Sequence, residues 1–209
     1  GFNAFVLRYS VKPSVFPVAL LEAADAMTMI REHAAEWHVD PDVIAVIGFS
    51  AGGHLAANLA TSTSDDVLVA HGYDPDAVRP NGLMLAYPVI TSGPLAHRGS
   101  FDSLLGERRN DSQALESVSI ERHIDAKTPP VFVWHTVPDE TVPYENTLML
   151  IDACKKAGVS IEAHLFPQGG HGLSLGTAET AWQGVNGIEP SIQIWPQLAV
   201  SWMRRTFAR

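Results

Sequence analysis

The stretch VIAVIGFSAGGHLAANLA, from Val43 to Ala60, constrains the fold of this chain more than any other. A run of apolar residues leads into GFSAGG at residues 48–53, and an alanine-rich, helix-like segment follows at once. A serine with glycines two residues before and after it, between a buried strand and a helix, fits only a very tight turn, where side chains at the glycine positions would collide with the strand and the helix. The turn strains the serine backbone and projects its hydroxyl above the sheet edge. Ser50 is therefore a candidate nucleophile.

Strands and helices alternate along the rest of the chain. The apolar runs predict strands over residues 2–9, 43–49, 83–90, 129–136 and 161–166, and the helical periodicity predicts helices over 17–38, 51–61, 147–157 and 194–207. Between residues 91 and 128 the pattern weakens, which predicts an insertion or a small helical cap. The alternation favours an α/β fold with one domain over residues 1–209, built on a doubly wound, mostly parallel sheet flanked by helices.

Composition excludes several classes of protein. The chain has 14 Lys and Arg against 23 Asp and Glu, a net charge of −9, and no basic patch, so we expect no nucleic-acid partner. Glu22 and Asp25 interrupt the most hydrophobic helical candidate before the roughly 20 residues of a membrane span, so we expect no membrane partner. The N-terminus carries no basic leader, which favours a cytoplasmic protein. The single cysteine, Cys154, forms no internal disulfide and is interpreted as a half-buried structural thiol.

Two further candidate residues follow the later strands, where functional groups gather in a parallel α/β sheet. Asp139 comes after the strand at residues 129–136, and His171 comes after the strand at residues 161–166, within the glycine-rich stretch QGGHG. Together with Ser50 they give the chain order serine, acid, histidine, which is typical of one class of nucleophilic hydrolase. Glu140 is an alternative acid; Asp139 is preferred because it lies on the turn directly after the strand.

Each candidate also has a structural interpretation. Ser50 could cap the following helix, Asp139 could cap a turn or a helix, and His171 could be an exposed loop histidine.

The other histidines are weaker candidates. His54, on the first turn of the helix after Ser50, is interpreted as a packing or hydrogen-bonding neighbour, and His135 as a buried core residue. His33 and His38 lie five residues apart on one predicted helix, which is poor geometry for a metal site. The sequence contains no H-E-x-x-H motif and no Cys/His cluster, so we expect no metal.

The stretches GFSAGGHLAA, PPVFVWHTVPDETVP and HLFPQGGHGLSL, in this order, resemble the α/β-hydrolase superfamily and, within it, the acetyl-xylan-esterase-like, carboxylesterase-type group. The likeness covers nearly the whole chain. It implies that Ser50 is the nucleophile, His171 the general acid and base, Asp139 the carboxylate that orients the histidine, and the Ala51 N–H one oxyanion donor. It also implies that no cofactor is needed.

The chain departs from this family at its front. The family has a glycine-rich loop of the HGGG kind. The strand that carries this loop lies between the counterparts of residues 2–9 and 43–49, and the chain contains neither the loop nor the strand. We therefore expect a hydrolase fold that lacks its N-terminal strands, with backbone groups on 2–9 and 43–49 pairing with each other after a shift or with another copy of the chain.

The expected function is a serine esterase that acts on small-molecule or carbohydrate esters with short acyl groups, acetyl above all. Two alternatives stay open: a peptidase or amidase of the same superfamily, and a non-catalytic hydrolase remnant without a complete oxyanion hole.

Overall fold

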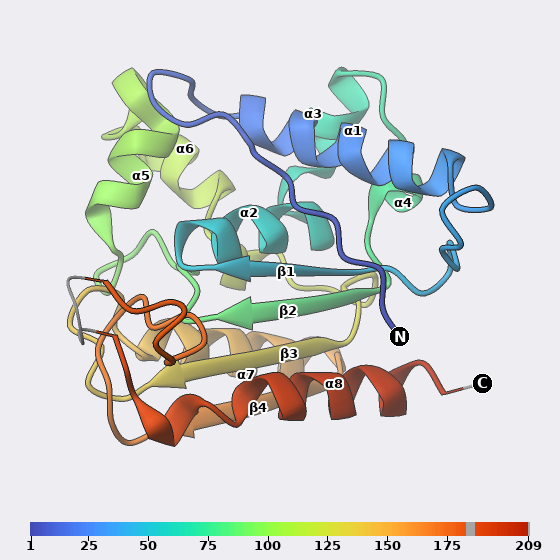
Figure 1. Cartoon of the computed structure of the whole chain (residues 1–209). Coiled ribbons are helices and arrows are strands. Elements are labelled where there is room, and N and C mark those ends of the chain that lie inside the picture. The colour runs from blue at the N-terminus through green and yellow to red at the C-terminus, as the bar shows by residue number, and fades with distance from the viewer. Residues whose placement is uncertain (183–186, 209) are drawn as a thin grey trace.

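The computed structural model, which describes residues 1–182 and 187–208, contains one parallel sheet of four strands. The strands lie side by side in chain order: β1 (Ala45–Phe49), β2 (Gly82–Ala86), β3 (Val131–Thr136) and β4 (Ile161–Phe166). All four arrows point the same way in Figure 1. The loops that follow the strands therefore meet along one edge of the sheet, and the predicted α/β fold is confirmed.

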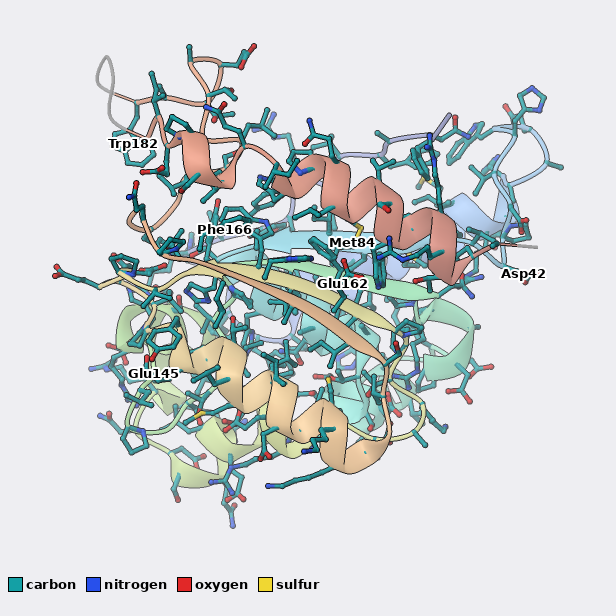
Figure 2. All side chains as sticks on the ribbon, turned by 90° about the horizontal axis from the view of Figure 1, so that it is seen from below. Asp42, Met84, Glu145, Glu162, Phe166 and Trp182 are labelled. Carbon is teal, nitrogen blue, oxygen red and sulfur yellow. The ribbon has the colours of Figure 1, made fainter. Side chains whose placement is uncertain are left out.

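Helices cover both faces of this sheet. On one face, α2 (Ala51–Ala60) and α7 (Glu145–Ala157) pack against β2 and β3 through a core that includes Ala57, Leu85 and Leu150. On the other face lies α8 (Trp195–Thr206), packed through Trp195 and Trp202, and Figure 2 shows α7 and α8 on opposite sides of the sheet. Among the described residues, no helix combines the length and the apolar character that a bilayer crossing requires.

Further helices surround this core. Outside α2 lies α1 (Val18–Glu32), which packs on it through Leu20, Ala24 and Leu59. Residues 91–128, where the sequence predicts an insertion or cap, contain α5 (Arg98–Leu105) and α6 (Ser112–Ser117) and the short 3₁₀ turns Gly106–Arg108 and Ile120–Arg122. Four short elements were not predicted from the sequence: the 3₁₀ turns Ser62–Ser64 and Pro190–Ile192, and the helices α3 (Asp65–Ala70) and α4 (Pro75–Val78).

The predicted strand over residues 2–9 is wrong. The segment is extended but pairs with no strand, and its apolar side chains are exposed, Phe2 by 57% and Val6 by 91%. A strand needs a neighbour for its backbone groups, and β1 is the outermost strand of the described sheet. Side-chain contacts hold the segment instead: the Asn3 amide donates to the Trp37 carbonyl oxygen at 3.0 Å, and the Ser10 hydroxyl donates to the Glu22 carboxylate at 2.6 Å.

Two smaller predictions also need correction. The first helix ends at Glu32, before residue 38, because the chain turns over residues 33–38 and the Trp37 ring folds back to stack on His33 at 4.7 Å. Cys154 is fully buried in the core between α7 and the sheet, where burial raises the pKa of its thiol to about 12.

Candidate active site

Ser50 lies on the turn between β1 and α2 in a strained backbone conformation, with φ at 53° and ψ at −120°. The turn is fixed from both sides: the Ser50 N–H donates to the Ala86 carbonyl oxygen at 3.0 Å, and the Ser50 carbonyl oxygen accepts from the Val89 N–H at 3.2 Å. The side chain makes no capping hydrogen bond to α2. The helix-cap interpretation therefore does not describe this serine.

Close packing around the turn explains two of its glycines. A Cβ at Gly48 would lie 2.7 Å from the Gly53 Cα, and a Cβ at Gly53 would lie 2.9 Å from the Pro88 Cβ. A Cβ at Gly52 would meet only the Tyr9 hydroxyl, at 3.3 Å. The expectation of a collision is therefore correct for Gly48 and wrong for Gly52, and Gly53 is the second position that has no room for a side chain.

The structure brings Ser50, His171 and Asp139 into one hydrogen-bonded chain. The Ser50 Oγ lies 2.7 Å from His171 Nε2, and His171 Nδ1 lies 2.6 Å from Asp139 Oδ2. A carboxylate only accepts, so Nδ1 carries the proton and Nε2 is free to accept from the serine hydroxyl. Glu140, the alternative acid, is exposed, and Asp139 is the carboxylate that contacts the histidine.

Asp139 is held by both of its oxygens. Oδ1 accepts from the N–H groups of Thr141 and Val142, each at 2.9 Å, and Oδ2 accepts from His135 Nε2 at 3.2 Å as well as from His171. Burial alone would raise the pKa of Asp139, but the hydrogen bonds from His135, His171 and Val142 hold it well below its usual range. The carboxylate is therefore ionised at neutral pH.

His135 is buried and satisfied, as predicted, but it also touches the site. Its Nδ1 accepts from the Thr147 hydroxyl at 2.8 Å, while its Nε2 faces the Val142 carbonyl oxygen at 3.0 Å and the Asp139 carboxylate. Both of these partners are acceptors, so Nε2 is the protonated nitrogen. His135 thus contributes to the orientation of Asp139.

Tyr87 is a site residue that the sequence analysis missed. It follows β2 with a positive φ of 40°, and its ring meets the His171 ring edge to face at 5.0 Å. Its hydroxyl accepts from the Ser174 N–H at 3.0 Å, three residues beyond His171. Tyr87 therefore anchors the loop that carries the histidine, and the only signal in the sequence is an aromatic residue at a strand end.

The remaining candidates lie on the first turn of α2. Ala51 is the first residue of the helix, so its N–H lies at the positive end of the helix dipole, next to Ser50. His54 is buried, with Nε2 donating to the Val118 carbonyl oxygen at 2.8 Å, and burial lowers its pKa to about 4. His54 is therefore a neutral neighbour, as the sequence analysis expects.

This geometry suits nucleophilic chemistry. A hydroxyl within hydrogen-bond distance of a histidine, which a buried carboxylate orients in turn, is the arrangement that activates serine for attack on an acyl carbon. In the part of the chain that the structure describes, no three or more His, Cys, Asp or Glu side chains gather as a metal ion would need.

The chain is similar to known hydrolases. A family model described as BD-FAE matches residues 1–153. The chain is 33% identical over 190 residues to endo-1,4-beta-xylanase B of Butyrivibrio fibrisolvens, covering 88% of the chain and 30% of that protein. It is 28% identical over 181 residues to an acetylxylan esterase of Xylanibacter ruminicola, covering 85% of the chain and 35% of that protein.

The sheet and its helices also match solved structures. The acetyl ester-xyloside bifunctional hydrolase from Caldicellulosiruptor lactoaceticus superposes with a TM-score of 0.79 at 36% identity, covering 94% of this chain and 69% of that one. The chain spans about a third of the length of the two curated relatives above.

Proposed function

The chain belongs to the BD-FAE family, within the carboxylesterase-type α/β hydrolases, and from this premise we propose that it is a serine esterase. The substrates are esters with short acyl groups, acetyl esters of carbohydrates among them. One observation carries the reaction type: the Ser50 hydroxyl lies 2.7 Å from His171 Nε2, with Asp139 on the other ring nitrogen. The substrate class is supported by the names of the relatives, which include an acetylxylan esterase.

The reaction proceeds through an acyl-enzyme. His171 Nε2 takes the hydroxyl proton as the Ser50 Oγ attacks the acyl carbon, and the same nitrogen then delivers that proton to the departing alcohol. Negative charge develops on the carbonyl oxygen near the Ala51 N–H, where the α2 dipole stabilises it. Water, deprotonated by His171, then releases the acid. Asp139 stays ionised throughout and stabilises the imidazolium.

We assign all of this to one domain over residues 1–209, with residues 91–128 as a small cap beside the site. The proposed reaction needs no cofactor. The binding partner of the protein is the ester substrate.

The test is nucleophile replacement. We expect Ser50→Ala to lower hydrolysis of p-nitrophenyl acetate by about 10⁴-fold or more, because removal of a catalytic serine leaves only the contribution of binding and the oxyanion site. The fold should survive, since alanine is small. Ser112→Ala, at an exposed serine that begins α6, is the matched control and should leave turnover unchanged.

Two further measurements separate the alternatives. A fluorophosphonate should transfer its phosphonyl group to the Ser50 Oγ with loss of fluoride, which mass spectrometry detects as the mass of that group on Ser50. The absence of both labelling and turnover would identify a non-catalytic remnant. Faster turnover of an aminoacyl amide than of an acetyl ester would identify an amidase. Turnover by Ser50→Ala within tenfold of the parent would contradict the assigned nucleophile.

A further inference from the structure

The loop that carries His171 has little of its own to hold it in one conformation. It leaves β4 at Phe166 and runs through PQGGHG, residues 167–172, where Gly169 and Gly172 have positive φ values of 99° and 76°. Figure 1 shows this loop in orange at the carboxyl ends of the strands. Because glycine allows many backbone conformations, the position of the histidine must be fixed by contacts with the rest of the fold.

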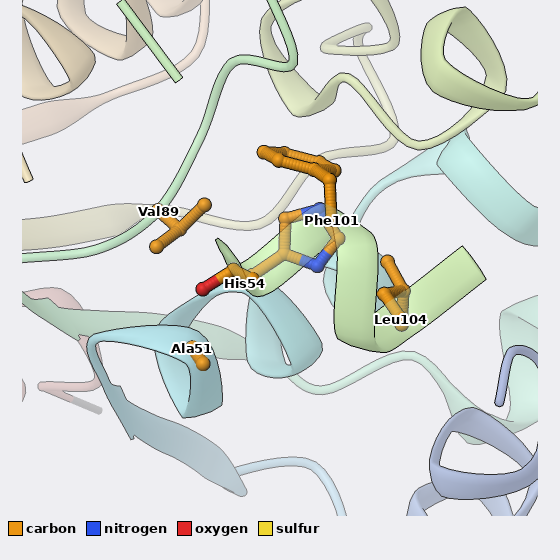
Figure 3. Close-up of a pocket in the computed structure, with 6 residues that line it drawn as sticks. Ala51, His54, Val89, Phe101 and Leu104 are labelled. Carbon is orange, nitrogen blue, oxygen red and sulfur yellow. The ribbon is translucent and has the colours of Figure 1, made fainter. Parts of the chain in front are cut away.

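The serine half of the Ser50–His171 hydrogen bond is fixed by the packed core. Both backbone groups of Ser50 are bonded across the turn, and on the first turn of α2 the His54 ring packs edge to face on Phe101 of α5 at 5.3 Å, beside a small cavity (Figure 3). The 2.7 Å distance between the Ser50 Oγ and His171 Nε2 therefore depends on what holds the histidine loop.

The part of the loop that follows His171 is anchored in the core. Leu173 is buried. The Ser174 N–H donates to the Tyr87 hydroxyl at 3.0 Å, and the Ser174 carbonyl oxygen accepts from the Trp195 indole N–H at 2.8 Å. These contacts all lie on one side of the histidine.

Thr136, the last residue of β3, anchors the part of the loop that precedes the histidine. Its hydroxyl donates to the carbonyl oxygen of Gly170, the residue directly before His171, at 3.1 Å. Among the described residues, no other hydrogen bond ties residues 167–170 to another segment. Thr136 itself is fully buried, so the core fixes the position of its hydroxyl.

Thr136 also supports the acid. Its carbonyl oxygen accepts from the Asp139 N–H at 3.3 Å, on the turn that follows β3. The backbone of Thr136 thus contacts the acid turn and its side chain contacts the histidine loop. These are the two segments that meet in the 2.6 Å contact between Asp139 Oδ2 and His171 Nδ1.

On the basis of the esterase function proposed above, we propose that Thr136 is a positioning residue, whose hydroxyl holds the histidine loop so that His171 lies between Asp139 and Ser50. Gly170 is exposed, so without this hydroxyl its carbonyl oxygen bonds to water and the loop is released while the core stays packed. A catalytic group that moves by about 1 Å can lose about 10² in rate.

Two variants of Thr136 and one control test the role of the hydroxyl. Thr136→Val keeps the branched shape and removes the hydroxyl. We expect kcat for p-nitrophenyl acetate to fall by about tenfold, the effect of one neutral hydrogen bond, and KM to change by less than about twofold, because no substrate-binding group is altered. Thr136→Ser keeps the hydroxyl and should restore kcat to within about threefold of the parent.

Thr61→Val is the matched control. Thr61 is also fully buried, and its hydroxyl donates to the Ala57 carbonyl oxygen at 2.8 Å, at the end of α2 away from Ser50. The same hydroxyl is therefore lost without a contact to the histidine loop, and kcat should stay unchanged. Fluorophosphonate titration corrects each kcat for the fraction of active protein.

Proton NMR adds a measurement that needs no turnover. The His171 Nδ1 proton, in a short hydrogen bond to Asp139, should give a low-field resonance that is absent in His171→Gln. In Thr136→Val this resonance should be lost through exchange with water, whereas Thr136→Ser and Thr61→Val should keep it.

The outcomes separate the two proposals. If the parent hydrolyses no ester, the esterase function fails, while loss of the resonance in Thr136→Val alone still supports the positioning role. If the parent is active and Thr136→Val keeps both its kcat and the resonance, the positioning role is wrong and the esterase function stands. An equal fall of kcat in Thr136→Ser or Thr61→Val would show that shape or general loosening of the core, rather than the hydroxyl of Thr136, causes the effect, which also overturns the assignment.

Discussion

At the scale of single residues, Asp139 unites two roles that the sequence leaves as alternatives. One oxygen accepts from the N–H groups of Thr141 and Val142 and shapes the turn after β3, while the other faces His171 and His135. A carboxylate with four donors around it keeps its charge. The residue that builds the turn is therefore the residue that orients the histidine, and turn geometry and site geometry depend on the same side chain.

This arrangement predicts a ranking of two acidic neighbours. Asp139→Asn should lower ester turnover by about 10³- to 10⁴-fold, because the amide cannot accept from all four donors and favours the wrong histidine tautomer. Glu140→Gln should leave turnover nearly unchanged, because Glu140 is exposed. Steady-state kinetics on p-nitrophenyl acetate measures both, and the reverse ranking would identify Glu140 as the acid.

His54 predicts a pH dependence of stability. Its pKa is about 4 in the folded protein and about 6.5 when unfolded, so the unfolded chain binds the proton more readily between these values. The contribution of the neutral His54 to the free energy of unfolding is therefore fully present above about pH 6.5 and is lost as the pH falls toward 4. The contribution amounts to about 3 kcal/mol.

Urea unfolding between pH 7.5 and 4.5 measures this effect. Over this pH range the free energy of unfolding should fall less for His54→Gln than for the parent, by most of that amount, while His71→Gln, at an exposed histidine, should follow the parent. Carboxylates titrate in all three proteins and cancel in the comparison. Parallel profiles for the parent and His54→Gln would show that His54 does not carry the effect.

At the scale of elements, the turn between β1 and α2 gives a test that separates its glycines. Gly48→Ala places a Cβ 2.7 Å from the Gly53 Cα, so the free energy of unfolding should fall by more than about 2 kcal/mol. Gly52→Ala meets only the movable Tyr9 hydroxyl and adds a better helix former, so it should change stability by less than about 1 kcal/mol. Urea midpoints measure both, and equal losses would mean that the packing at Gly48 is not the constraint.

The elements also divide into those that the sequence predicts and those that it does not. β1, α2 and β4 follow from local patterns, and Ser50, Asp139 and His171 follow from the strand ends, because a parallel sheet gathers those ends at one edge. The strand over residues 2–9 fails because pairing depends on a neighbour that a local apolar run cannot reveal. The contacts of Tyr87 and His135 with the site could not be predicted for a similar reason, because each depends on residues that the fold brings together from other segments.

At the scale of the whole molecule, the edge of the described sheet at β1 has no neighbouring strand. β1 is the outermost strand of the described sheet, Ile47 on it is 44% exposed, and the nearby N-terminal segment exposes Phe5 and Val6. An uncovered strand edge beside exposed apolar side chains is a template for pairing with another chain.

We therefore predict that the chain self-associates through this side. Light scattering over a dilution series should show an average mass that rises with concentration, and Ile47→Lys together with Val6→Lys should reduce the rise. Val69→Lys, at a 61% exposed valine on α3, adds charge elsewhere and is the control. If Val69→Lys alone has the same effect as the pair, net charge rather than the β1 edge governs association.

The buried thiol of Cys154 makes openings of the core measurable. Located between α7 and the sheet with a pKa near 12, it is shielded from alkylating reagents both by packing and by the scarcity of thiolate. A reagent reaches the thiol when this core opens, so the rate of alkylation measures how often the core opens. Alkylation of Cys154 therefore reports how often the native core opens, and it needs no engineered label. Turnover at Ser50 can be followed in the same protein.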